Sequence, residues 1–254
     1  MIVKVLVVYP AIFVTLIITG CASQVKVEEQ RAQAEAHYDL GVSLLNRGKL
    51  IDALAALEKA KTLYPHDPKI YNAIGLVYFG EEKFDTAAQN FQKAIQLNGD
   101  FVEAHNNLGA AYSRMGMWDR AIKEYRIALS DPLYRTPALA HYNIGYALLE
   151  KGDLVEALEE FRIATNLYPD FDWAVNKYGV ALFRLNRVHE AIKKFKRAVE
   201  INPNYVEPYS NLGLAYMKLG EREEAIKQFK EVLRLAPEGS ELANNARRYL
   251  DILE

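Results

Sequence analysis

The sequence predicts an all-α protein, an α-solenoid of six helix-turn-helix units followed by a C-terminal capping helix. The first observation is a glycine that returns in steps of 34, 34, 36, 34 and 34 residues. The second is that apolar residues around each glycine follow helical spacing. A fixed period of this length is typical of stacked repeats, each of which packs mainly on its neighbours. The repeat glycines are Gly41, Gly75, Gly109, Gly145, Gly179 and Gly213.

The first 20 residues are expected to be an export signal. Lys4 is followed by the apolar run from Val5 to Ile18 and then by small residues, which is how a secretory signal is built. Pro10 interrupts the run, and the run is shorter than the roughly 20 residues that span a bilayer. The alternative interpretation is an uncleaved membrane anchor.

Cys21 is the only cysteine in the chain. The sequence Ile18-Thr19-Gly20-Cys21 resembles the lipobox of bacterial lipoproteins. This resemblance implies that residues 1–20 are removed, that Cys21 is acylated, and that residues 21–33 form a lipidated N-terminus and tether. Ala22 follows the cysteine, and by resemblance to enterobacterial lipoproteins this implies the outer membrane, with the protein facing the periplasm.

Each repeat is expected to contain two helices that approach closely at the glycine. In the first repeat, His37, Leu40, Gly41 and Leu44 share one helical face, and Ala53, Leu57 and Ala60 share another. Glycine inside a helix costs about 1 kcal/mol relative to alanine, so tight packing is expected there. Turn residues between the helices are Gly48, Gly116, Gly152, Asn186 and Gly220, and prolines close four units at Pro65, Pro169, Pro203 and Pro237.

These motifs resemble the tetratricopeptide repeat (TPR), for example Ile144-Gly145, Ala157, Phe161 and Ala164 in the fourth copy. The resemblance implies a right-handed α-solenoid. The expected units are 34–67, 68–101, 102–135, 138–171, 172–205 and 206–239. Residues 240–254 then form a capping helix, with Leu242, Ala246, Leu250 and Leu253 toward the array and Asn244, Arg247 and Arg248 outward.

The junction at 130–137 holds two extra residues and two prolines, which forbid a regular helix. It can be read as a tolerated loop insertion. A similar Pro-Leu-Tyr junction followed by an Asn-x-Gly helix, here Asn143-Ile144-Gly145, occurs in the type IV pilus biogenesis lipoproteins PilF and PilW. That resemblance implies a pilotin, which helps a secretin subunit, or an amphipathic segment of it, reach the outer membrane and assemble. The alternative is a general envelope scaffold that recruits peptidoglycan enzymes.

The sequence favours neither catalysis nor a cofactor. His37, His105 and His141 belong to separate repeats and are expected to be packing residues, so no metal site is predicted. Carboxylate pairs such as Glu159-Glu160 are expected on solvated helix faces. A net charge of −2 does not suggest a nucleic-acid surface. No small-molecule substrate and no nucleic-acid partner are expected.

A protein-binding groove is expected along the first helices of the repeats. Apolar side chains at these positions suggest a partner site, although ordinary packing between repeats explains part of them. Asparagines near the glycines could clamp a peptide backbone or bond the neighbouring helix. The predicted groove residues are Tyr38, Val42, Leu45, Leu76, Phe79, Asn106, Tyr142, Tyr146, Trp173, Asn176, Phe183 and Met217.

Overall fold

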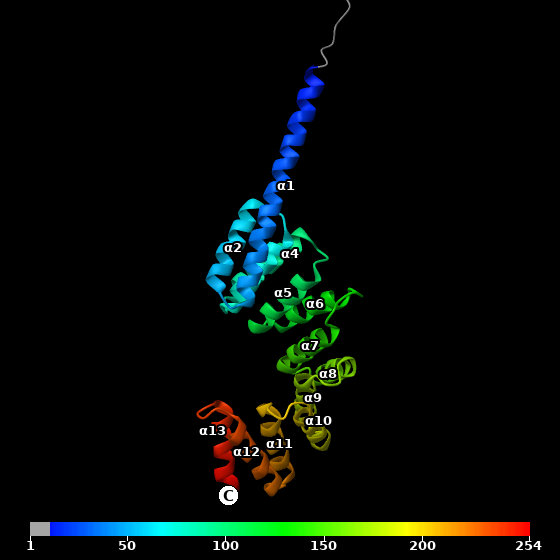
Figure 1. Ribbon diagram of the computed structural model, residues 1–254. Helices are drawn as coiled ribbons and strands as arrows, with labels where there is room; N and C mark the ends of the chain where they lie inside the picture. Colours follow the sequence, from blue (N-terminus) through cyan, green and yellow to red (C-terminus); the bar gives the residue numbers. More distant parts are fainter. Residues whose placement is uncertain (1–10) are drawn as a thin grey trace, which may run out of the picture. The chain divides into compact units, whose positions relative to one another are not determined.

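The computed structural model describes the backbone of residues 11–254 and the side chains from residue 26 onward. Residues 1–10 of the predicted signal and the side chain of Cys21 lie outside the described residues. Over the described range the chain forms α-helices and no strand, which confirms the all-α prediction (Figure 1). The helices are α1 (Ala11–Asn46), α2 (Leu50–Leu63), α3 (Pro68–Gly80), α4 (Phe84–Leu97), α5 (Val102–Arg114), α6 (Trp118–Leu129), α7 (Pro137–Lys151), α8 (Leu154–Leu167), α9 (Asp172–Arg184), α10 (Val188–Ile201), α11 (Val206–Leu219), α12 (Arg222–Leu235) and α13 (Glu241–Leu253).

The helices follow one another as the predicted pairs, and α13 follows the last pair. The turn inside a pair needs one residue with a left-handed backbone, which glycine and asparagine adopt most easily. Gly116 has φ +70° and Asn186 has φ +63° at these turns. In the second pair Glu82 takes this conformation with φ +60°, although its residue type gives no sign of it.

The repeat glycines lie where the two helices of a pair touch. A Cβ on Gly75 would lie 2.5 Å from Cε1 of Phe91, and one on Gly145 would lie 2.8 Å from Cε1 of Phe161. Both rings are completely buried. The glycine therefore makes room for the large side chain of the second helix, as the sequence predicted.

The chain divides into two compact units, one ending at Asn107 and the other beginning at Leu108. The core of the first unit includes Leu57, Ile70 and Ile74. A core cluster of the second unit includes Phe195 and Phe229. In both units the buried aromatic and aliphatic side chains come from the paired helices, so each core is a row of inter-helix contacts.

Helix α1 is 36 residues long, whereas its partner α2 has 14. Figure 1 shows the N-terminal part of α1 running beyond the other helices of the first unit. The predicted tether, residues 21–33, lies within this helix, and its described side chains at 26–33 are exposed. Among the described residues, the helices contain no apolar stretch long enough to cross a membrane.

The irregular junction lies between α6 and α7 in the second unit. The side chain of Asp131 accepts a hydrogen bond of 2.7 Å from the backbone N–H of Leu133, which stabilises a tight turn. Helix α7 then begins at Pro137, and proline suits the first helical position because no N–H is needed there. The two extra residues thus separate the third and fourth helix pairs by a local turn.

The C-terminal helix α13 covers the end of the last pair, as expected. Ala246 and Leu250 are buried in the core cluster of the second unit, whereas Arg247 and Arg248 are exposed. The ring of Tyr249 stacks on Phe229 at 4.9 Å between centroids. A solenoid needs such a helix with one polar face to cover its final apolar surface.

Candidate protein-binding surface

The predicted groove residues of the first unit are half-buried. Tyr38, Val42 and Leu45 on α1 pack against the core of that unit. On α3, Leu76 and Phe79 are also half-buried, and the ring of Phe79 lies 5.3 Å from that of Phe84. These side chains therefore serve inter-helix packing as well as any exposed face. Asn106 on α5 is half-buried too.

The groove residues of the second unit fall into two groups. Phe183 and Met217 pack against the core cluster of that unit. In contrast, Trp173 at the start of α9 is 53% exposed. Tyr142 and Tyr146 on α7 are half-buried. The second unit thus combines a packed section with an accessible aromatic section.

The accessible aromatic section is built around Phe171. Its ring centroid lies 5.1 Å from that of Tyr142, 5.8 Å from Tyr168 and 6.4 Å from Trp173. Tyr142 also contacts the buried ring of Phe161 at 6.1 Å. Aromatic rings at these separations attract one another and hold their orientation. The result is a fixed set of rings that reaches from the core to the surface.

Asn176 does not present its side chain to a partner, because it is completely buried. Its Nδ2 donates to the hydroxyl of Tyr205 at 3.1 Å, and its Oδ1 accepts from Nδ2 of Asn211 at 2.9 Å. This corrects its predicted place in the groove. In the first unit, Nδ2 of Asn107 donates to Oδ1 of Asn72 at 2.9 Å. These asparagines bond the neighbouring helix, one of the two roles expected for them.

The same network extends to charged groups. Lys177 Nζ lies 2.9 Å from Oε1 of Glu207, and the hydroxyl of Tyr205 donates to Oε2 of Glu207 at 3.0 Å. Burial, followed by the charge of Glu207, raises the pKa of Tyr205. The same two causes raise the pKa of Tyr142 to about 12. Both phenols are therefore neutral at physiological pH and can act as hydrogen-bond donors.

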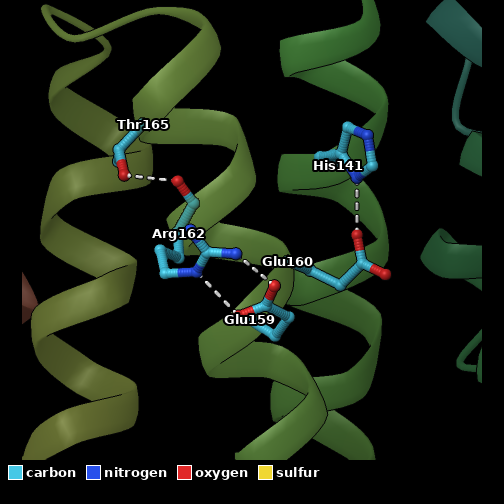
Figure 2. Close-up of polar contacts among 5 residues, drawn as sticks. All are labelled: His141, Glu159, Glu160, Arg162 and Thr165. Carbon is cyan, nitrogen blue, oxygen red and sulfur yellow. Dashed lines mark hydrogen bonds and ion pairs between the residues drawn. The ribbon is translucent and has the colours of Figure 1, made fainter.

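Figure 2 shows how the carboxylates of Glu159 and Glu160 are used. Glu159 accepts two hydrogen bonds from Arg162, its neighbour on the exposed face of α8. Glu160 instead reaches across to α7, where its Oε2 lies 2.6 Å from Nδ1 of His141. The prediction of a solvated face holds for Glu159, whereas Glu160 and His141 join two helices and are both mostly buried.

A pocket that was not predicted from the sequence lies at the start of α7. Its volume is about 630 Å³, and most of its lining is apolar. We call it the junction pocket, because it borders the irregular turn between α6 and α7. The lining residues are Arg135, Thr136, Pro137, Ala138, Leu139, Leu167, Tyr168 and Phe171.

The described residues contain no group of three or more His, Cys, Asp or Glu side chains placed to hold a metal ion. His105 is buried, and its Nε2 lies 3.1 Å from the carbonyl oxygen of Gly99. His141 is occupied by Glu160. These two histidines therefore have structural contacts inside their own units.

Models of the tetratricopeptide repeat match most of the chain. One, described as TPR repeat, matches residues 78–116 and 179–220. Two described as Tetratricopeptide repeat match residues 34–67 and 206–238, and residues 111–170. The matched segments include five of the six repeat glycines, all but Gly75.

Curated relatives are similar over part of their length. The chain is 31% identical over 114 residues to the chloroplastic tetratricopeptide repeat domain-containing protein PYG7 of Arabidopsis thaliana, covering 43% of this chain and 38% of PYG7. It is 24% identical over 156 residues to the type IV pilus assembly protein PilF of Pseudomonas aeruginosa, covering 59% of this chain and 62% of PilF. The match thus spans less than two thirds of either relative.

Two solved structures are similar to a larger part of the chain than these relatives are. The structure of Pseudomonas aeruginosa PilF has a TM-score of 0.75 at 19% identity and covers 87% of this chain and 99% of PilF. That of PilW, a type IV pilus biogenesis factor, has a TM-score of 0.77 at 19% identity and covers 84% of this chain and 97% of PilW. At this identity the similarity establishes the fold. With its repeats matched by sequence and by structure, the chain belongs to the tetratricopeptide repeat family.

Proposed function

We propose that this chain is a non-catalytic, protein-binding lipoprotein of type IV pilus biogenesis. In this proposal it acts as a pilotin, which aids outer-membrane targeting and assembly of the secretin. The lipid on Cys21 holds it at the outer membrane, facing the periplasm. Its partner is a secretin subunit, bound through an amphipathic segment.

The observation that carries the proposal is the end-to-end correspondence with PilF and PilW. The similarity covers 99% of PilF, a type IV pilus assembly protein, and 97% of PilW, a type IV pilus biogenesis factor. The lipobox-like sequence before Cys21 supports membrane attachment. The accessible aromatic section supports protein binding, because aromatic side chains supply much of the energy of protein interfaces.

The decisive experiment is deletion of the gene, followed by a measurement of secretin multimers in the outer membrane and of surface pili. We expect multimers and pili to be lost and to return when the intact gene is supplied. Unchanged multimers and pili would contradict the pilotin role. Recovery of peptidoglycan hydrolases without secretin in a pull-down would instead favour the envelope scaffold.

The membrane attachment is tested by Cys21→Ser, which removes the thiol that would be acylated. We expect the variant to move from the membrane fraction to the soluble periplasmic fraction, because the thioether-linked lipid can no longer form. Ala22→Ser is the matched control and should stay in the membrane fraction. A Cys21→Ser protein that is processed normally and remains membrane-bound would refute lipid anchoring.

A further inference from the structure

We propose that the junction pocket binds an amphipathic segment of a partner protein, which inserts apolar side chains and places a carboxylate beside Arg135. This inference deepens the proposed protein-binding function and rests on it. It assigns the partner to the pocket at the start of α7 and the end of α8.

Three apolar side chains that line the pocket are exposed to solvent. Leu139 is 36% exposed, Leu167 is 52% exposed and Tyr168 is 54% exposed. They meet in one concave site on two neighbouring helices. Single exposed apolar residues are ordinary, but several that line one pocket mark a binding site.

The apolar character is specific to this part of the array. Leu139 stands six residues before its repeat glycine, and the next copy has Trp173 at the same position. The other four copies carry a charged residue there. Those residues are Glu35, Lys69, Glu103 and Glu207. In two consecutive repeats, an apolar residue therefore stands where the other repeats have a charged one, and both lie next to the pocket.

The pocket wall is held in place before any partner arrives. Pro137 fixes the beginning of α7, and Phe171 is held between Tyr142 and Trp173. The backbone N–H of Phe171 also donates to the carbonyl of Tyr168 at 3.2 Å. A preformed wall loses little conformational freedom on binding, so more of the contact energy contributes to affinity.

The charge around the pocket favours a partner with a carboxylate. Arg135 is exposed and is the one charged residue of the lining, and among the described residues it makes no hydrogen bond or ion pair. The neighbouring acids are already engaged. Asp170 pairs with Arg197 at 2.7 Å, and Asp172 accepts from Asn202 at 2.8 Å. The free guanidinium can form a bidentate pair with a carboxylate.

The test is a fluorescence anisotropy titration of the full chain with two labelled amphipathic peptides. Both carry the same leucine and tryptophan stripe, flanked in one by glutamate and in the other by lysine. We expect saturable binding of the glutamate peptide, up to about fivefold tighter than that of the lysine peptide, as an exposed ion pair provides. Leu167→Glu should weaken binding of the glutamate peptide about tenfold, because it removes an apolar contact and places a carboxylate against those of the peptide. Arg135→Glu should reverse the preference between the peptides, because a carboxylate at this position attracts lysine and repels glutamate.

The matched control is Val155→Glu, since Val155 is 71% exposed on the same helix α8 but does not line the pocket. It should bind both peptides like the unmodified chain, and circular dichroism should show equal folding of all variants. No saturable binding, equal affinity for the two peptides, or an equal loss in Val155→Glu would overturn the inference. Sedimentation with phosphatidylcholine–phosphatidylglycerol vesicles that Leu167→Glu abolishes, without peptide binding, would show a membrane-contacting face instead and also overturn it.

The same variants separate this inference from the proposed function. If Leu167→Glu restores secretin multimers fully in the deletion strain, the pocket is not the partner site, although the pilotin role stands. If deletion leaves the multimers unchanged but the peptides still bind as expected, the pilotin role fails and the peptide-binding pocket stands.

Discussion

Gly179→Ala places a methyl group against a buried ring. The new Cβ would lie 2.5 Å from Cε1 and 2.7 Å from Cδ1 of Phe195, whose side chain is 1% exposed. Contacts this short require a helix shift or a ring displacement, and overpacking of this kind costs about 1–3 kcal/mol. Alanine recovers about 1 kcal/mol of helix propensity. Contacts below 3.0 Å place the cost in the upper part of that range, about 2–3 kcal/mol, so we expect a net loss of about 1–2 kcal/mol.

Thermal unfolding followed by circular dichroism measures this effect. A loss of this size should lower the midpoint by about 2–8 °C in a chain of this length. The control is Gly99→Ala, because a Cβ there would meet nothing within 4 Å. Its midpoint should change by less than about 2 °C, as expected for a surface substitution.

A double-mutant cycle identifies the cause. Phe195→Ala removes the ring and should itself destabilise the protein by about 3–5 kcal/mol. In that background Gly179→Ala no longer meets the ring and should stabilise by up to about 1 kcal/mol. If Gly179→Ala leaves the midpoint unchanged in the intact protein, or destabilises equally in both backgrounds, close helix approach is not the reason for the glycine.

Two further substitutions test individual buried groups. Burial raises the pKa of Tyr125 to about 12, above its ordinary value of 10, so the unfolded chain loses its proton first and the stability from this group falls as the pH rises between about 10 and about 12. Tyr125→Phe should reduce the loss of stability over that pH range in urea titrations, with little change at pH 7, whereas an unchanged alkaline slope would contradict the assignment. Asn176→Ala should lower the free energy of unfolding by about 1–3 kcal/mol, because it removes a completely buried amide and leaves the half-buried Asn211 without its acceptor. Asn244→Ala, at an exposed position, is its control, and an equal effect of the two substitutions would show that the buried bond contributes nothing.

Most of the fold could be predicted from the repeat pattern, because the recurring residues contact each other inside one helix pair. Gly145 and Phe161 recur at a fixed spacing, and the structure places them against each other. The period also marks position 82, which lies 34 residues after Gly48 and 34 before Gly116, but a glutamate there gives no sign of the left-handed backbone. Local preference alone would place glycine or asparagine there.

The candidate site was less accessible to sequence reasoning because exposure depends on contacts between repeats. Asn176 and Trp173 lie three residues apart on α9, yet one is completely buried and the other is 53% exposed. Leu167 occupies the end of a second helix, where Leu63 and Leu97 stand in other copies. It lines a pocket because the junction before Pro137 contributes residues to the same lining, and the break in the period marks this place in the sequence.

The continuity of α1 has a consequence for how the protein would stand on a membrane. The 13 residues from 21 to 33 form part of one helix and not a flexible linker. If Cys21 carries the lipid, this helix connects the membrane anchor to the first repeat. At about 1.5 Å per residue, this helix holds the first repeat about 20 Å from the anchor. It also fixes a direction, because each residue added to the helix turns everything beyond it by about 100°. The length of the helix therefore sets both the distance of the first unit from the bilayer and its rotation about the helix axis. Inserting one residue would rotate the first unit, whereas removing seven would nearly preserve its orientation and bring it closer to the bilayer.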